Sequence, residues 1–322
     1  MNVERFGDIS KITLPTTFSV GDVNVYVVKG DRLTLVDAGV KTKASWEALV
    51  YGLSQLGYAP KDLEQVVLTH HHPDHVGLLD FLPDGIDVIG HKYCANWLSR
   101  DESYLKEYVE FLRALYLQFG LKEVEFPLSQ IGATLKVSCE QSKLTQVMQE
   151  GERLFGMDEW TVYETLGHAQ SHLVFFREKD GSLLAGDHVL ATISSNPILE
   201  PPLIKNAARP KPLVQYNHSL KKMLELPIHI AYTGHGTEVK DTHELVNRRL
   251  ARQHERAMSV YEMLKEKPMT AFQVCQQLFP AVYQKEIALT LSQSVGQLDY
   301  LQEIGHIEAQ MNDEGVLYFV PL

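Results

Sequence analysis

The sequence predicts an α/β fold in which helices cover a β core, followed by a smaller C-terminal unit of helices and a hairpin. Between residue 10 and about residue 245, short runs of apolar and β-branched residues alternate with helical stretches. From Arg256 onward the chain is rich in helix-forming residues and ends in two strand-like runs. No apolar run reaches the roughly 18 residues that a membrane span needs, so no membrane partner is expected.

The expected elements of the larger unit follow one another in a regular order. Alternating apolar residues predict strands within residues 10–40, around a turn at residues 29–31. Apolar residues three and four apart predict helices over residues 43–57 and 101–119. Further strands are expected at residues 65–68, 87–89, 160–165, 172–176, 182–185 and 229–232. The second helix interrupts the strands, so we interpret residues 95–150 as a helical insertion beside the core.

The C-terminal unit is expected to start after a charged connector at residues 246–255. This interpretation divides the chain into a catalytic domain, residues 1–250, and a small domain, residues 251–322. The last residues, GHIEAQMNDEGVLYFVPL, predict two strands around a turn at residues 312–315. Helices followed by a hairpin indicate a winged-helix domain.

Composition limits the compartment and the partners. The net charge is −11, which opposes broad binding to nucleic acid because phosphate contacts need clustered Lys and Arg. Cys94, Cys139 and Cys275 are scattered and odd in number, as in proteins of a reducing compartment, and we expect them to be buried. The first residues, MNVERFGDIS, carry acids and no apolar stretch, so a cytoplasmic protein is expected.

A histidine-rich stretch that directly follows the expected strand at residues 65–68 indicates a metal site. In LTHHHPDHVG, the residues His70, His72, Asp74 and His75 form the pattern H-x-H-x-D-H. Residues i and i+2 of an extended segment point the same way, so the first two imidazoles can hold one ion. The turn at Pro73 then redirects the next two side chains toward a second ion.

A metal pair needs more ligands than this loop contains, and three later strand ends supply them. The candidates are His168 in ETLGHAQSH, Asp187 in LLAGDHV and His235 in AYTGHG. Glycines stand beside them and let the backbone pass close to a site; they are Gly167, Gly186, Gly234 and Gly236. The other nearby histidines are expected to be structural, or to support the ligands from outside, and not to be ligands; they are His71, His91, His172 and His188.

Together, the stretches LVDAG, THHHPDH, TLGHAQSH, AGDHV and TGHG resemble the metallo-β-lactamase superfamily over residues 10–245. The resemblance implies an αββα sandwich with two divalent metal ions at one edge. It assigns His70, His72 and His168 to one ion. It assigns Asp74, His75 and His235 to the other, with Asp187 as the bridge. Asp37 would steady the site from outside, or would simply be a turn residue before Gly39. Zinc is the expected metal, and the ligands also suit iron or manganese.

The same resemblance narrows the activity. Classical metallo-β-lactamases lack the bridging carboxylate at Asp187, and diiron flavoprotein oxidoreductases carry Glu at the position of His72. The remaining branch is similar to glyoxalase II, although Leu166 and Ser171 replace the usual Pro and Gly of its third motif. The C-terminal stretches MTAFQVCQQLFP and SVGQLDYLQEIGHIEA resemble the winged-helix tail of the lactamase-beta-like subgroup, not the glutathione-binding tail of true glyoxalase II.

The expected function is therefore a dinuclear metal hydrolase. A bridging hydroxide, oriented by Asp74, would attack an ester or thioester of a small acyl compound. The alternative is a phosphodiesterase or single-strand ribonuclease, for which basic residues are available at Lys205, Arg209 and Lys211. A metal-dependent DNA-binding regulator is a third reading, opposed by the full ligand set.

Two structural roles are left to be decided. The helix at residues 101–119 either covers the active-site mouth, with Tyr108, Tyr116 and Phe119 favouring hydrophobic acyl groups, or packs away from it. The C-terminal domain is expected to bind no DNA, because residues 286–322 contain no Lys or Arg. We expect it to shape the substrate entrance or a homodimer contact.

Overall fold

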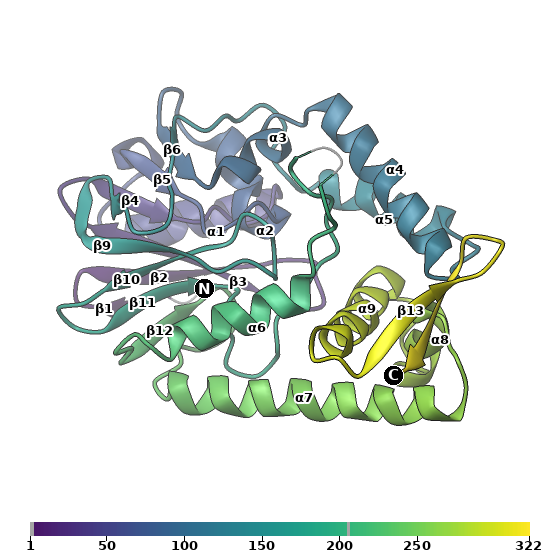
Figure 1. Cartoon of the computed structure of the whole chain (residues 1–322). Helices are drawn as coiled ribbons and strands as arrows, with labels where there is room; N and C mark the ends of the chain where they lie inside the picture. Colours follow the sequence, from purple (N-terminus) through teal and green to yellow (C-terminus); the bar gives the residue numbers. More distant parts are fainter. Residues whose placement is uncertain (1–2, 205–206) are drawn as a thin grey trace.

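The computed structural model describes residues 3–204 and 207–322 (Figure 1). Two sheets pack face to face. In spatial order, the first sheet contains β1 (Val3–Phe6), β2 (Ile9–Leu14), β3 (Val23–Lys29), β4 (Leu33–Val36), β5 (Gln65–Val67), β6 (Asp87–Gly90) and β7 (Gln146–Val147). The second contains β12 (Ile230–Thr233), β11 (Ser182–Gly186), β10 (Leu173–Arg177), β9 (Met157–Glu164) and β8 (Arg153–Leu154).

Both faces of the central strands are buried, which explains their continuous apolar character. In β3, Val25 and Val27 join the core on the outer face of the first sheet, whereas Tyr26 and Val28 join the core between the sheets. In β10, Phe175 likewise points between the sheets and Phe176 points outward. Successive side chains of a strand alternate between faces, so each strand contributes to two cores.

Helices complete a helix–sheet–sheet–helix arrangement. On the first sheet lies α1 (Lys43–Gln55), which buries Ala48, Leu49 and Leu53, and whose N-cap Thr42 accepts a hydrogen bond from the Ser45 amide. On the second sheet lie α6 (Pro212–Met223) and the first half of α7 (Thr242–Glu266). Short helical turns complete this part: η1 (Pro60–Asp62), α2 (Pro73–Val76), η2 (Gly77–Phe81), η3 (Lys92–Cys94) and α3 (Ala95–Leu98). The predicted α/β fold is confirmed.

The insertion and the C-terminal helices share one hydrophobic core. The insertion contributes α4 (Glu102–Gln118) and α5 (Glu125–Leu135). The C-terminal region contributes α8 (Ala271–Leu278), α9 (Ile287–Glu303), β13 (Ile307–Met311) and β14 (Leu317–Pro321). Leu112 and Tyr116 of α4 belong to the same buried cluster as Leu291 and Val295 of α9. Figure 1 shows these elements together on one side of the sandwich.

The prediction of a charged connector at residues 246–255 is wrong, because this segment lies inside α7. Its charged residues other than Arg249 are exposed. The buried residues recur at helical spacing; they are Leu245, Val246, Arg249, Gln253, Ala257, Val260 and Leu264. The helix runs unbroken past residue 250 and contributes to the second sheet's outer core and to the C-terminal core. The division into domains at residue 250 stays a prediction.

Most expected strands lie within a few residues of their predicted places, and the hairpin turn at residues 312–315 is confirmed. The elements that were not predicted include β1, α5 and α6. All three cysteines are buried, as expected. In the described part of the chain, none of the helices combines the length and apolar character that a membrane crossing requires.

Candidate metal centre

The candidate ligands come together because they follow strands that run in the same direction within each sheet. Asp37 follows β4, the His70–His75 loop follows β5, and these two strands are parallel neighbours. In the second sheet, His168 follows β9, Asp187 follows β11 and His235 follows β12. The carboxyl ends of such strands meet at one edge, where irregular backbone can present side chains to a shared space.

The first group of ligand atoms comes from His70, His72 and His168, whose atoms lie within 4.8 Å of one another. Nε2 of His70 is 3.0 Å from Nδ1 of His72. His168 is oriented from behind, because its Nδ1 donates to the Asn196 carbonyl at 2.9 Å and its Nε2 therefore faces the group. A ring nitrogen held in this way fixes which nitrogen stays free for a metal.

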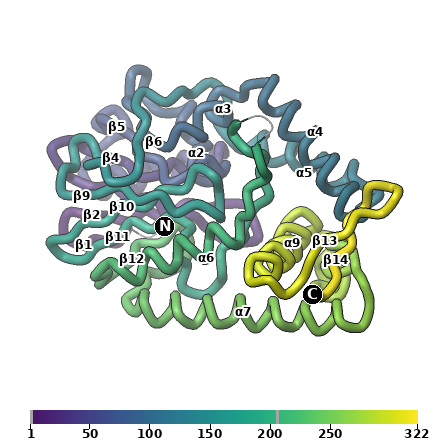
Figure 2. Tube along the Cα trace, in the orientation of Figure 1, coloured from purple at the N-terminus to yellow at the C-terminus, as the bar shows by residue number. Residues whose placement is uncertain are grey.

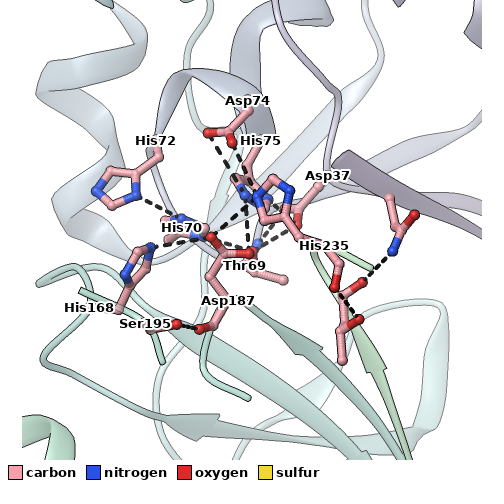
Figure 3. Close-up of polar contacts among 12 residues, drawn as sticks. Asp37, Thr69, His70, His72, Asp74, His75, His168, Asp187, Ser195 and His235 are labelled. Carbon is pink, nitrogen blue, oxygen red and sulfur yellow. Dashed lines mark hydrogen bonds and ion pairs between the residues drawn. The ribbon is translucent and has the colours of Figure 1, made fainter. Parts of the chain in front are cut away.

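The second group comes from Asp74, His75 and His235, also within 4.8 Å (Figure 3). Nε2 of His235 is 3.3 Å from Oδ2 of Asp74. On their far sides, Nδ1 of His75 lies 2.8 Å from Oδ2 of Asp37, and Nδ1 of His235 lies 2.8 Å from the Asp22 carbonyl oxygen. Both imidazoles thus present Nε2 to the site.

Asp187 lies between the two groups. Its Oδ2 is 3.4 Å from Nε2 of His168 and 3.5 Å from Nε2 of His235, and its Oδ1 is 3.5 Å from Nε2 of His75. The backbone leaves room for this carboxylate only because residue 234 is glycine, since a Cβ there would lie 2.1 Å from Oδ1 of Asp187. All seven residues predicted as ligands meet at this edge.

These side chains fit divalent metal ions. Within residues 3–204 and 207–322, the Nε2 atoms of His75, His168 and His235 and Oδ1 of Asp187 are buried without an aligned hydrogen bond. Unpaired buried polar atoms are costly, so lone pairs that converge in this way indicate a ligand. Two ligand atoms about 2.1 Å from a tetrahedral zinc ion lie about 3.4 Å apart, which matches the spacing around Asp187.

Electrostatics divides the histidines into two kinds. Burial, together with neighbouring imidazoles, lowers the pKa of His70 and of His72 well below the usual value. For His235, burial also acts to lower the pKa, but the carboxylates of Asp187 and Asp74 outweigh it and raise the pKa to about 10. Asp187 and Asp37 raise the pKa of His75 against burial in the same way. The carboxylates therefore create a field that attracts positive charge.

Asp37 is both a turn residue and a partner of the site. Its φ of 62° lies in the left-handed region, which Asp tolerates better than most residues. Its Oδ1 accepts from the Thr69 amide at 2.8 Å, and its Oδ2 accepts from the Thr69 hydroxyl at 2.7 Å as well as contacting His75. The two interpretations of this residue describe one arrangement: the turn brings the carboxylate behind the histidine loop.

Other histidines hold the loops in place. Nε2 of His172 accepts a hydrogen bond from the Asp187 amide at 3.2 Å, while Thr165 contacts its Nδ1. Nδ1 of His71 contacts the Ser171 hydroxyl at 2.8 Å, and its Nε2 lies 3.2 Å from Oε1 of Glu200. Ser171, which departs from the family's motif, thus fixes the histidine between two candidate ligands.

A cavity of about 730 Å³ opens beside the metal centre. The candidate ligands His72, Asp74, His168 and Asp187 line one part of it. Apolar residues from the insertion, from the segment after β11 and from α9 form much of the remaining wall; they include Tyr108, Leu112, Tyr116, Ile131, Ile198, Leu199 and Ile287. The cavity is therefore shared by the sandwich, the insertion and the C-terminal region.

The expected place of the 101–119 helix at the cavity is confirmed for Tyr108 and Tyr116 and wrong for Phe119. The Phe119 carbonyl accepts a hydrogen bond from the Phe272 amide, and its ring lies 5.8 Å from the Arg209 guanidinium carbon. Phe119 follows the end of α4, so its direction depends on the turn and not on the helical stripe. It joins the core shared with the C-terminal helices.

The contributions of residues 187–211, which join β11 to α6, were not predicted from the sequence. Ser195 donates to the Asp187 carbonyl, Asn196 accepts from His168, and Glu200 accepts from the Gln170 amide at 2.9 Å. This segment has no periodic pattern of apolar residues. Its prolines at positions 197, 201 and 202 were the available signal for an extended, fixed backbone.

Comparisons with known proteins agree with this geometry. The model of the metallo-beta-lactamase superfamily matches residues 19–235. The chain is 46% identical to the probable metallo-hydrolase YqjP of Bacillus subtilis over 299 residues, covering 92% of each chain.

Two solved structures share the fold. The metallo-beta-lactamase family protein TTHA1429 of Thermus thermophilus superposes with a TM-score of 0.82 at 26% identity, over 98% of this chain and 99% of that one. A beta-lactamase domain protein from Burkholderia ambifaria, at 19% identity, has a TM-score of 0.77 over 99% of this chain and 94% of its own. This chain therefore belongs to the metallo-beta-lactamase superfamily of metal-dependent hydrolases.

Proposed function

We propose that this hydrolase cleaves an ester or thioester of a small acyl compound, with the acyl group held in the apolar part of the cavity. One observation carries the proposal: buried ligand atoms without aligned hydrogen bonds converge beside a largely apolar cavity of about 730 Å³. This volume suits a small organic molecule. The ligand motifs resemble those of glyoxalase II-like enzymes, which supports an ester or thioester as the bond that is cleaved. The C-terminal region does not resemble the glutathione-binding tail of true glyoxalase II.

Two divalent ions, most simply zinc, would be held in this site. His70, His72 and His168 would hold one, Asp74, His75 and His235 would hold the other, and Asp187 would contact both. When bound, such ions supply a water of lowered pKa and polarise a carbonyl oxygen. Asp74 lines the cavity and can accept a hydrogen bond from the attacking water, which orients that water toward the carbonyl carbon. The apolar wall excludes other water from the acyl group.

Substrates with phosphates are less well supported. Arg209 makes two hydrogen bonds to Asp299, at 2.9 and 2.5 Å, and Lys211 lies 3.5 Å from Glu303. Lys205 lies outside the described residues. Lys285 is the only Lys or Arg among the described residues that line the cavity. A phosphodiesterase or ribonuclease is therefore the weaker candidate, since the phosphate backbone needs more free cations than these.

The experiment that tests the proposal is a substrate panel. The full-length protein, loaded with zinc, iron or manganese in turn, is assayed on a short-chain thioester, a lactone, a bis-aryl phosphodiester and single-stranded RNA. Hydrolysis of the thioester or lactone well above the other two is expected. Preferential cleavage of the phosphodiester or RNA would replace this proposal with the runner-up.

A substitution in the cavity wall tests where the acyl group binds. Tyr108 is buried, and its ring centroid lies 5.0 Å from that of Trp97. We expect Tyr108→Ala to lower kcat/KM about tenfold for a hexanoyl substrate, because a contact of one or two methylenes is lost, and to change an acetyl substrate less. Tyr51→Ala, at an exposed position on α1, is the control. Equal kcat/KM for both chain lengths in Tyr108→Ala would place the acyl group elsewhere.

We propose that the C-terminal region is a winged helix that shapes the cavity and does not bind DNA. Ile287, Ala288, Leu289 and Ser292 of α9 line the cavity. Asp299 and Glu303 of α9 form ion pairs with Arg209 and Lys211. We expect the full-length protein to show no salt-sensitive retention of duplex DNA in a gel-shift assay. Tight binding that weakens steeply with salt would contradict this expectation.

A further inference from the structure

The segment at residues 187–211 connects the candidate metal centre to the C-terminal helix α9. It begins at the candidate ligand Asp187 and ends at α6. Figure 2 shows the described part of this segment, residues 187–204 and 207–211, leaving the edge of the second sheet and passing beside the C-terminal helices. Its carbonyl at Asn196 accepts the Nδ1 proton of His168 at 2.9 Å, so its position determines the orientation of that imidazole.

Two adjacent residues of α9 hold the same stretch of this segment. The Gln293 side-chain amide donates to Oδ1 of Asn196 at 2.8 Å. The Ser292 hydroxyl accepts from the Leu199 amide at 3.3 Å. Gln293 is 6% exposed and Ser292 is 3% exposed, so water competes little for either bond. Asn196 is thus bound on one side to a helix and on the other to a candidate metal ligand.

A second buried amide pair on α9 has no such connection. Nε2 of Gln297, one turn further along, donates to Oε1 of Gln253 in α7, also at 2.8 Å. This pair joins two helices of the C-terminal core and involves no residue of the 187–211 segment. The two pairs match in chemistry and length, although the Gln297 pair is the more buried, and they differ in whether the partner contacts His168.

We propose that Gln293 is a positioning residue for the metal centre, acting through Asn196 on His168. Its amide fixes the Asn196 side chain, the side chain fixes the peptide that carries the carbonyl, and the carbonyl fixes the imidazole with Nε2 toward the ion. The C-terminal region therefore controls metal affinity as well as forming a cavity wall. This inference rests on the proposed role of His168 as a ligand.

The test measures zinc affinity in the full-length protein by competition with a chromogenic chelator, alongside thermal unfolding of the zinc-free chain. Outer partners of metal ligands contribute about 10- to 100-fold in affinity, so Gln293→Ala is expected to weaken one of two bound zinc ions about tenfold. Asn196→Ala is expected to have a similar effect. The double variant is expected to be no weaker than either single variant, because both remove the same contact.

Gln297→Ala is the control, and it is expected to lower thermal stability while leaving both zinc affinities unchanged. Parental zinc affinity in Gln293→Ala would overturn the proposal. So would an equal loss of affinity in Gln297→Ala, since that result would show a general effect of core stability. Failure of the proposed function is distinguishable, because the unmodified chain would then bind no zinc, or bind zinc and hydrolyse no acyl substrate.

Discussion

Asp187→Asn is expected to reduce hydrolysis of the best panel substrate on the order of 100- to 1000-fold, the effect of losing one preorganised electrostatic contact in an active site. The carboxylate is within 3.4–3.5 Å of three imidazole nitrogens that belong to both ligand groups. An amide of the same shape offers one neutral oxygen and one donor, so it cannot contact two cations equally. The fold is expected to persist, because the backbone N–H of residue 187 still donates its hydrogen bond to Nε2 of His172.

Three measurements check this result. Turnover gives the size of the loss, elemental analysis gives the metal content, and thermal unfolding of the metal-free protein shows that the fold is retained. The unmodified chain is expected to hold two ions and Asp187→Asn fewer. Asp158→Asn, at an exposed position in β9, is the matched control. Unchanged turnover with two ions in Asp187→Asn would refute the bridging role.

Asp37→Asn is expected to weaken zinc binding about 10- to 100-fold, the usual effect of losing the outer partner of a metal-bound histidine. Asn tolerates the φ of 62°, and its oxygen can still accept from the Thr69 amide. Its NH2 group would replace Oδ2, however, and would face Nδ1 of His75 and the Thr69 hydroxyl. Nδ1 would then accept a hydrogen bond instead of donating one, which places the ring proton on Nε2, where the metal would bind.

The comparison with Asp37→Ala separates this effect from folding. Alanine is disfavoured at positive φ and leaves the buried Thr69 amide without its partner, so the free energy of unfolding should fall as well. Chelator competition on both variants, with thermal unfolding of the zinc-free forms, checks the prediction. If Asp37→Asn binds both zinc ions with parental affinity, the carboxylate is only a turn residue.

The candidate ligands could be predicted from sequence because each belongs to a short local pattern. His70, His72, Asp74 and His75 occupy one loop, and His168, Asp187 and His235 each follow an apolar strand with a glycine beside it. Strands in the same direction bring their ends to one edge, so local patterns were sufficient. Alternating apolar residues similarly located most strands of the two sheets.

The outer contacts depend on long-range packing and left no such pattern. Gln293 meets Asn196 across 97 residues, and Ser171 meets His71 across 100 residues. The prolines of residues 187–211 indicate an extended backbone, but no local pattern there identifies the contacts with α9. The charged stretch of α7 was misread because its buried face includes Arg249 and Gln253, whose polar character hides the helical repeat.

The cavity walls and the candidate ligands come from separate stretches of chain. The ligands stand in loops after strands, whereas much of the wall comes from the insertion between β6 and β7 and from the start of α9. Lineages that inherit the same ligand loops can therefore diverge in substrate by exchanging or remodelling the insertion and the tail. A chimera that carries another family member's insertion would then acquire that member's acyl preference and retain its own metal affinity. If the tail is exchanged as well, Gln293 has to be kept, because it positions His168 through Asn196.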